Sequence, residues 1–325
     1  MPRVSLFAPM RKSLLAALVI LGAAGSAAAG DGQAGEAFVT NQGDSTVSVV
    51  DLETLKVLET IDVGGNPAGV AVSGDRAQVF VTAPEAKELV VIDAGTRRIA
   101  KRVTVGAGPL GIAAHPTNGR VYVADWYEHK LSVIDPAAGT VLAKVETGDS
   151  PSGVAVTPDG KLILTADRDS NSVSIIDAAT NTRLGGVDVG TRPFGITIDP
   201  EGKRAYTANV KSDDVSVIDI AARKVVATVP VGRRPYAVAL AGGRAFVTNQ
   251  YAASMSVIDL ASLTVERTLP VGEYPEGIAA SADGTALYVA CWFDNVLQRF
   301  DAKTLAATGE ADVGDGPRAF GLFLR

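Results

Sequence analysis

The sequence is poor in the residues that most often carry catalytic or metal chemistry. Its 325 residues include one cysteine, Cys291, and two histidines. Cys291 therefore has no partner for a disulfide within the chain, and no haem-attaching Cys-x-x-Cys-His motif occurs. The sequence also lacks a Gly-x-Ser-x-Gly elbow, a Walker loop and a His-Glu-x-x-His motif. We therefore expect a protein that is not an enzyme, with Cys291 as a small buried side chain.

A dinucleotide-binding site is disfavoured as well. The run at 106–111 contains the three glycines of that pattern. The pattern works by placing a pyrophosphate at a helix N-terminus, and no helix is predicted after this run.

Residues 1–29 predict a signal peptide. Three basic residues, Arg3, Arg11 and Lys12, precede an apolar core at 14–21, and three alanines follow at 27–29. The core is too short to span a bilayer. We predict cleavage after residue 29, a short linker at 30–36, export to the periplasm and no membrane span in the mature chain.

The charge of the chain is acidic. Its net charge is −6, and removing the three basic residues of the predicted signal peptide leaves −9. An acidic surface repels phosphate backbones, so we expect no nucleic-acid partner. A small ligand or a periplasmic protein is the expected partner, and we expect a monomer.

One short pattern occurs seven times in the remaining chain. An aspartate that ends a Ser-Val-Ile-Asp-like run is followed thirteen residues later by a glycine, and three residues after that by a proline. The aspartates are 42 residues apart in five intervals and 40 in one. The three columns are Asp51, Asp93, Asp135, Asp177, Asp219, Asp259 and Asp301; Gly64, Gly106, Gly148, Gly190, Gly232, Gly272 and Gly314; and Pro67, Pro109, Pro151, Pro193, Pro235, Pro275 and Pro317. A period of this length is typical of a solenoid, a propeller or an array.

Each repeat contains four strand-like runs. In the copy that begins at Pro151 they lie at 153–156, 162–166, 173–176 and 183–189, separated by turn residues. Seven such units predict an all-β, seven-bladed β-propeller over 37–325. The chain begins at a second strand and ends on a first one, at 319–324. We therefore expect this last strand to complete a blade with the three N-terminal strands and to close the ring.

Some of these runs have a recognisable motif. The runs FVTN at 38–41 and 246–249 and AYTAN at 205–209 precede the repeated Ser-Val-Ile-Asp and Val-Gly-x-x-Pro elements. In these features the chain resembles the YVTN family of β-propeller repeats over 37–325. The resemblance implies a scaffold fold whose members have varied roles.

The resemblance also implies two functional alternatives. YVTN-like propellers are similar to the heavy subunits of periplasmic quinone-dependent amine dehydrogenases and to haem d1-binding domains, which suggests an accessory or cofactor-binding subunit of a redox system. Only His129 is placed to be an axial ligand, so such a role needs a separate partner or a bound cofactor. A lactonase-like enzyme is disfavoured because no histidine–carboxylate cluster occurs.

The order of strands decides which loops share an end of the ring. The Val-Gly-x-x-Pro connections and the loops between second and third strands meet at one end, which we call the loop face. The turns at the Pro-Asp-Gly positions, and those after each repeated aspartate, meet at the opposite end, the turn face. Because the aspartate is present in every copy, we expect it to accept hydrogen bonds in its own turn.

Residues that break the repeat on the loop face are the candidates for binding. They combine aromatic, basic and acidic side chains: Trp126, Tyr127, Arg168, Arg192, Arg234, Tyr251, Glu276, Trp292 and Arg318. Their shared face predicts a ligand-binding or partner-binding site at the mouth of the central channel.

A hard cation is the other predicted ligand. Asp167 and Asp169 begin an Asp-x-Asp-x-Asn run, and Asp125 lies in the neighbouring copy. Carboxylates at this spacing can bind a calcium-like or trivalent ion. The run departs from an EF-hand loop, with Ser172 at the sixth position and Ala178 at the twelfth. An Asx-rich hairpin turn is the alternative interpretation, and a cation carrier or sensor is the alternative function.

Overall fold

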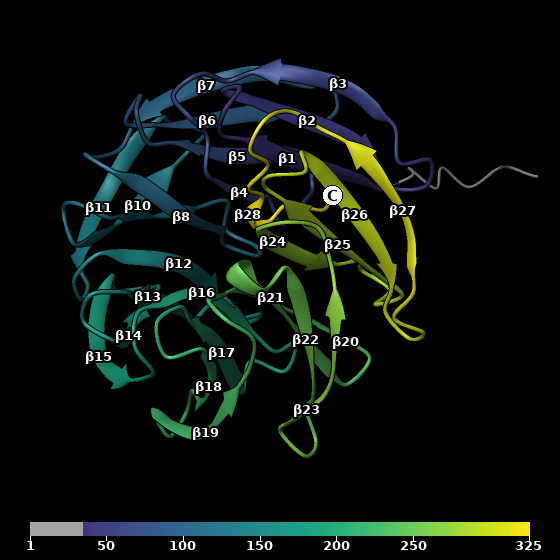
Figure 1. Cartoon of the computed structure of the whole chain (residues 1–325). Helices are drawn as coiled ribbons and strands as arrows, with labels where there is room; N and C mark the ends of the chain where they lie inside the picture. Colours follow the sequence, from purple (N-terminus) through teal and green to yellow (C-terminus); the bar gives the residue numbers. More distant parts are fainter. Residues whose placement is uncertain (1–34) are drawn as a thin grey trace, which may run out of the picture. The chain divides into compact units, whose positions relative to one another are not determined.

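The repeats form a ring of seven four-stranded blades in the computed structural model, which describes residues 35–325 (Figure 1). The predicted seven-bladed β-propeller is confirmed. The predicted signal peptide lies outside the described residues, as does most of the predicted linker. The only helical element in the described part of the chain is the short turn η1 (Gln250–Ala252). No helix there is long and apolar enough to cross a membrane.

The strands follow the repeat along the chain. In order they are β1 Glu36–Asn41, β2 Thr46–Asp51, β3 Val57–Asp62, β4 Gly69–Val72, β5 Gln78–Ala83, β6 Glu88–Asp93, β7 Arg98–Thr104, β8 Pro109–Ala114, β9 Val121–Asp125, β10 Lys130–Asp135, β11 Thr140–Glu146, β12 Pro151–Val156, β13 Leu162–Asp167, β14 Ser172–Asp177, β15 Thr182–Asp188, β16 Pro193–Ile198, β17 Arg204–Asn209, β18 Asp214–Asp219, β19 Lys224–Pro230, β20 Pro235–Ala241, β21 Arg244–Asn249, β22 Ser254–Asp259, β23 Thr264–Pro270, β24 Pro275–Ala280, β25 Ala286–Cys291, β26 Val296–Asp301, β27 Ala307–Asp312 and β28 Phe320–Leu322.

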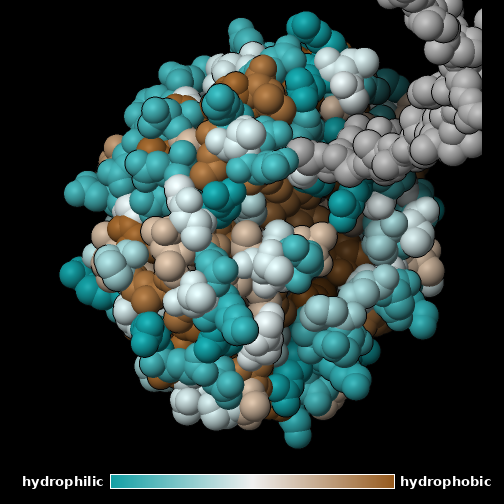
Figure 2. Space-filling model, turned by 90° about the vertical axis from the view of Figure 1, so that its right-hand side faces the viewer, coloured by the Kyte–Doolittle hydropathy of each residue, from teal (hydrophilic) through white to brown (hydrophobic). Residues whose placement is uncertain are grey.

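Burial within a blade changes from the channel to the rim. In the sheet β12-β13-β14-β15, the two middle strands are buried on both faces, whereas the outermost, β15, is largely exposed. The middle strands are sandwiched between neighbouring blades, so their side chains are apolar in both directions. On the face shown in Figure 2, many of the outermost residues are hydrophilic, with hydrophobic residues in the recesses between them.

The repeated aspartates stabilise the turns after the third strands, as predicted. Asp177 accepts hydrogen bonds from the backbone N–H of Thr180 (2.7 Å) and from its hydroxyl (2.8 Å). These bonds lower the pKa of Asp177. Equivalent bonds hold the turns of the other six blades, at Asp51, Asp93, Asp135, Asp219, Asp259 and Asp301. This column is therefore structural.

Two sets of loops meet on the loop face, as the strand order predicts. In the blade of β4 and β5 the residue after the second strand is Pro84, which has no N–H, and Glu85 donates to the carbonyl of Gly65 instead (3.1 Å). In the other six blades, the carbonyl of the residue before the repeat proline accepts a hydrogen bond from the backbone N–H of the residue that follows the second strand. Examples are Ser150 with Arg168 (3.2 Å) and Arg234 with Gln250 (2.9 Å). These bonds connect each channel-entry loop to a second-to-third-strand loop and fix both around the mouth.

The C-terminal segment closes the ring. The N–H of Phe38 donates to Phe323 (2.9 Å) and that of Arg325 to Glu36 (2.7 Å), so the end of the chain lies antiparallel to β1. The predicted shared blade is confirmed. The structure adds a parallel pairing of β28 with β4, the inner strand of the next blade (Figure 1). The closing strand therefore binds two blades.

Phe323→Ala should destabilise the whole propeller. Phe323 is fully buried in a core cluster shared with β1 and β2. Truncating a buried phenylalanine to alanine costs about 3–5 kcal/mol. The matched control is Leu322→Ala in the same segment, because Leu322 is 57% exposed. Urea unfolding should show a large decrease in the free energy of unfolding for Phe323→Ala and a small decrease for Leu322→Ala. Equal stability of the two variants would contradict closure of the ring by this strand.

Candidate functional site

A single column of residues lines the loop-face mouth of the channel. It is the position directly after each repeat proline, and the residue differs in every blade although the following residue is always glycine or alanine. Its members are Ala68, Leu110, Ser152, Phe194, Tyr236, Glu276 and Arg318. We call this set the mouth ring. Contacts among Phe194, Tyr236, Glu276 and Arg318, described below, show that these four side chains converge.

Three aromatic side chains close the channel below the mouth. Phe194 lies 4.5 Å from Tyr236 and 5.0 Å from Phe320, and Tyr236 lies 5.5 Å from Phe320 between ring centroids. All three are buried. Tilted and edge-on contacts at these distances are favourable for aromatic rings. This aromatic plug divides the channel into a part at the loop face and a part at the turn face.

A buried ion pair lies beside the plug. Nε of Arg318 is 2.9 Å from Oε2 of Glu276 and also donates to the hydroxyl of Tyr236 (3.0 Å). Arg318 Nη1 donates to the side-chain oxygen of Gln42 (3.1 Å), and Gln250 donates to Oε1 of Glu276 (2.6 Å). Oε2 is close to the guanidinium but has no hydrogen bond of acceptable geometry. It therefore retains the capacity to accept one.

Burial and the neighbouring arginine have opposite effects on the ionisation of this carboxyl group. Glu276 is only 3% exposed. Burial raises its pKa, and the positive charge of Arg318 offsets part of that rise. A buried carboxylate of this kind is stabilised by its cation, so the pair constrains the mouth.

Further arginines lie on aromatic faces around the mouth. The guanidinium of Arg168 is 5.2 Å from the ring centroid of Trp126, and that of Arg234 is 4.7 Å from Tyr251. Such stacking holds the cation in place. Burial lowers the pKa of Arg168, although Asp169 opposes this change, and the charges of Arg192 and Arg234 add to the lowering. The charges of Arg192 and Arg234 therefore disfavour the charged form of Arg168.

Only part of this positive charge is neutralised locally. Asp169 Oδ1 lies 2.6 Å from Arg168 and 3.8 Å from Arg192, so one carboxylate serves two arginines. Arg234 donates to the neutral side chain of Gln250 (2.6 Å). Arg168 and Arg192 thus share one carboxylate, and Arg234 is held by a neutral amide.

Two arginines are placed by an unusual backbone conformation. Arg192 and Arg234 have φ values of 59° and 54°, in the left-handed region that residues other than glycine seldom adopt. Each N–H is held by the preceding blade: Arg192 donates to Asn171 (2.8 Å) and Arg234 to Asp213 (2.7 Å). These bonds hold the conformation and fix where the arginines leave the backbone.

Aromatic residues also lie on the rim of the loop face. Tyr274 contacts Tyr251 (5.7 Å) and Phe293 (5.0 Å) between ring centroids. Tyr127, Tyr251 and Phe293 are between 52% and 70% exposed. Large exposed aromatic side chains of this kind are typical of binding surfaces.

A pocket of about 270 Å³ opens in the mouth. Leu110 and Phe194 of the mouth ring form part of its wall together with Trp126 and Tyr127, and Arg318 adds a charged group. Trp126 also lies 6.3 Å from Phe194 between ring centroids. The pocket therefore combines an apolar wall with a cation, which suits an anionic group on an apolar body.

The structure brings together most of the predicted binding residues. Contacts connect Arg168 with Trp126, Arg234 with Tyr251, and Arg318 with both Glu276 and Trp292; the guanidinium of Arg318 is 5.8 Å from the Trp292 ring. Sequence reasoning missed Leu110, Phe194, Tyr236, Phe320, Gln42, Gln250 and Tyr274. The first three share the mouth-ring column with Glu276 and Arg318, so a comparison of that column across all seven copies would have revealed them.

The three aspartates predicted to bind a hard cation have other partners. Asp167 accepts hydrogen bonds from the hydroxyls of Thr165 (2.7 Å) and Ser174 (2.5 Å), and burial raises its pKa. Asp125 accepts from backbone N–H groups, including that of Gly108 (3.1 Å), and Asp169 pairs with Arg168. Within residues 35–325, no group of three or more acidic, histidine or cysteine side chains is arranged to hold a metal ion. Asp125 thus accepts hydrogen bonds from backbone N–H groups of its own loop, whereas Asp167 bonds to hydroxyl groups of β13 and β14, and Asp169 to an arginine.

Both histidines are also held by the repeat. Nδ1 of His129 accepts a hydrogen bond from the N–H of Ser150 (2.9 Å). Asn171 and Asp213 accept the equivalent bond in the next two blades, so His129 occupies a structural column. Nε2 of His115 lies 3.0 Å from the carbonyl of Gly160 at the turn face. The geometry therefore assigns both histidines to loop structure.

Comparison with known proteins agrees with this fold. Residues 9–120 match the model of the YNCE-like beta-propeller family, and residues 136–229 match that of the lactonase 7-bladed beta-propeller family. Each match covers about a third of the chain, and both describe propellers. The chain is a seven-bladed β-propeller. The comparison with curated proteins gives no significant match.

Solved structures show the same architecture at low sequence identity. Kuenenia stuttgartiensis hydrazine synthase has a TM-score of 0.72 at 20% identity, over 78% of this chain and 89% of that chain. A functionally unknown protein from Desulfotomaculum acetoxidans has a TM-score of 0.75 at 16% identity, over 88% and 99%. The dihydro-heme d1 dehydrogenase NirN in complex with DHE has a TM-score of 0.65 at 16% identity, over 87% and 74%. At these identities the similarity establishes the fold alone.

Removing Arg318 should make stability depend on Glu276. In Arg318→Met the buried carboxyl group loses its cation, and breaking such a pair costs about 3–5 kcal/mol. Burial raises the pKa of Glu276 in the folded protein. As pH rises above about 4.3, the unfolded chain therefore loses this proton before the native state does, and stability falls. Relative to the wild type, the free energy of unfolding measured in urea should therefore fall more for Arg318→Met at pH 8 than at pH 5.

The matched control is the double variant Arg318→Met with Glu276→Gln. It has no carboxyl group at this site, so the extra pH dependence should disappear. If the single and double variants respond to pH in the same way, Glu276 does not depend on Arg318 for its charge.

Proposed function

We propose that the protein binds an organic anion with an apolar, ring-containing body at its loop-face mouth. The observation that carries the proposal is the arrangement of arginines on aromatic faces around a pocket with an apolar wall. Arg168 stacks on Trp126, and Arg318 borders the same pocket. Cations offer direct hydrogen bonds to a carboxylate or sulfonate, while the aromatic wall binds the body of the ligand.

Ligand binding without chemical conversion is the simplest function for this arrangement. Two acidic side chains at the mouth are already paired with arginines: Glu276 with Arg318, and Asp169 with Arg168 and Arg192. Their role in the proposal is to position the arginines. An anionic segment of a partner protein presents the same chemistry as a small ligand, and it forms the alternative occupant of the mouth.

A role in a redox system is the second candidate. One structural neighbour is a dihydro-heme d1 dehydrogenase in complex with DHE, and another is a hydrazine synthase. A carboxylate-bearing cofactor would belong to the ligand class proposed here. Because Nδ1 of His129 is engaged by Ser150, the proposal assigns binding to the arginines and aromatic residues rather than to a histidine ligand.

Anilinonaphthalene sulfonate, an aromatic anion, is a direct probe of the mouth. Arg192→Gln and Arg234→Gln should each weaken its binding about tenfold, which corresponds to the loss of one charge-assisted hydrogen bond. Trp126→Ala should weaken it as well, through the lost aromatic contact. Probe fluorescence and calorimetry should both report the change.

The control is Arg98→Gln on the outer strand β7. The Arg98 side chain is 78% exposed and pairs with Glu59 (3.5 Å), away from the mouth. This variant should bind the probe like the wild type, and added salt should weaken binding to both. If Arg98→Gln and Arg234→Gln have equal effects, the mouth is not the anion site.

We also propose that this binding takes place in the periplasm. The proposal rests on the charged, apolar and small-residue pattern of residues 1–29. Expression of the full-length chain in a Gram-negative host should give a shortened protein in the periplasmic fraction. Retention of the uncleaved chain in the cytoplasmic fraction would refute the export signal.

A further inference from the structure

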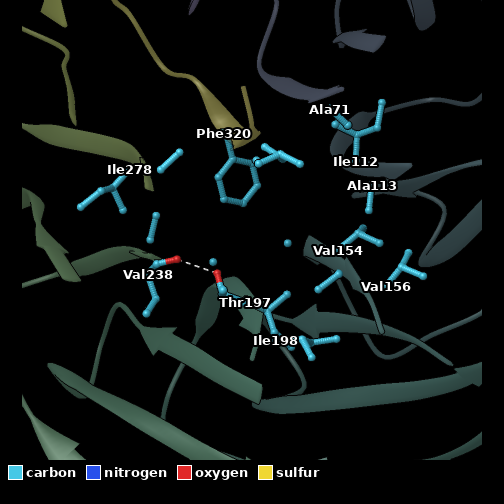
Figure 3. Close-up of a pocket in the computed structure, with 18 of the residues that line it drawn as sticks. Ala71, Ile112, Ala113, Val154, Val156, Thr197, Ile198, Val238, Ile278 and Phe320 are labelled. Atoms are coloured by element: carbon cyan, nitrogen blue, oxygen red, sulfur yellow. Dashed lines mark hydrogen bonds between the residues drawn. The ribbon is translucent and has the colours of Figure 1, made fainter. Parts of the chain in front are cut away.

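A second cavity lies in the channel on the other side of the aromatic plug. Its volume is about 390 Å³, and all seven inner strands contribute to its wall (Figure 3). Pro200, in a turn at the turn face, forms part of its edge, so the cavity opens at that end. Phe320 lies on its wall, and with Phe194 and Tyr236 it separates this cavity from the loop-face mouth.

The side chains of the lining are almost entirely aliphatic, and its polar surface comes mainly from backbone groups. Among the described residues, the side chains around the cavity carry no charge, and Thr197 is the only polar one. Its hydroxyl donates to the carbonyl of Val238 (2.6 Å), so it is already satisfied (Figure 3). The rest of the wall includes the aliphatic side chains of Val154, Val156, Ile198 and Ile278 (Figure 3).

The wall is also well supported. Its residues belong to six separate core clusters, including those of Val72, Ile112, Val154, Ile196 and Val238. Four of these clusters pack between two neighbouring blades and the other two span more than two, so core residues support the wall from behind. A space of this size is large compared with the small voids of ordinary protein cores. An apolar cavity of about 150 Å³ is enough to bind benzene.

We infer that this cavity binds an uncharged, hydrocarbon-like small molecule. The lining offers no charge to pair with an ion, and burying an unpaired charge is strongly unfavourable. An alkyl chain or a small aromatic molecule replaces water against the aliphatic wall, which is favourable. Because the wall is preformed, little ordering cost opposes binding. The protein therefore has two binding sites of opposite chemistry, separated by the plug.

The test uses phenylnaphthylamine, which has the hydrocarbon skeleton of anilinonaphthalene sulfonate without the sulfonate. The wild-type protein should bind it saturably at one site, with enhanced probe fluorescence, and decanol should compete. Added salt should leave the affinity unchanged, since no charge takes part. Val156→Trp should weaken binding at least tenfold, because the larger side chain fills the cavity.

Several controls make the result decisive. Val156 and Ile198 are both half-buried on the wall, so Ile198→Trp replaces the first variant if that one fails to fold. Leu142→Trp adds a tryptophan on the outer strand β11, where the side chain is 49% exposed, and should bind like the wild type. Arg234→Gln should also bind phenylnaphthylamine normally, which separates this site from the proposed anion site.

The inference is overturned by either of two results. One is the absence of saturable phenylnaphthylamine binding to the wild-type protein. The other is unchanged affinity in a folded Val156→Trp or Ile198→Trp variant. Loss of anilinonaphthalene sulfonate binding in the arginine variants bears only on the loop-face mouth.

Discussion

The closing contact between the C-terminal segment and β1 is the constraint on which the rest of the molecule depends. Backbone hydrogen bonds from Phe38 to Phe323 and from Arg325 to Glu36 join the two ends of the described chain. The same segment supplies Arg318 to the mouth and Phe320 to the plug. Closure and site formation are therefore one event, because an open ring would separate Arg318 from Glu276 and leave the channel without its central aromatic side chain.

The repeat divides its positions between structure and function. Repeat positions that carry the same residue in every blade stabilise the fold. The aspartates that accept hydrogen bonds in their turns are an example. The mouth ring is the clearest variable column, ranging from Ala68 to Arg318. A rigid frame allows this variation, because each blade's backbone is fixed by its neighbours and not by the side chain at the mouth.

The two ends of the channel differ because successive positions of the inner strands have different chemistry. Near the loop face the mouth ring contains aromatic and charged residues, whereas further along the same strands Val154, Ile278 and their equivalents are aliphatic. The plug is formed where the two regions meet, by Phe194 and Tyr236 from one and Phe320 from the other. One set of strands thus builds both a mouth with aromatic and charged side chains and an apolar cavity.

The sequence by itself determined the number of blades, the strands within them, the closing strand and the role of the repeated aspartates, because each of these follows from a local pattern repeated in register. Only the tertiary structure decided which side chains meet across the channel. The repeat places Glu276 and Arg318 in the same column, but it does not specify that they form an ion pair. It likewise does not specify the contact between Phe194 and Phe320, which lie in different columns. The Asp-x-Asp-x-Asn run that begins at Asp167 also shows that sequence spacing does not specify side-chain contacts. Asp167 resembles a cation ligand by spacing, but Thr165 and Ser174 occupy its oxygens in the folded blade. The repeat pattern in the sequence predicts which residues lie on the same face of the propeller. Side-chain packing in the folded structure decides which of those residues contact one another.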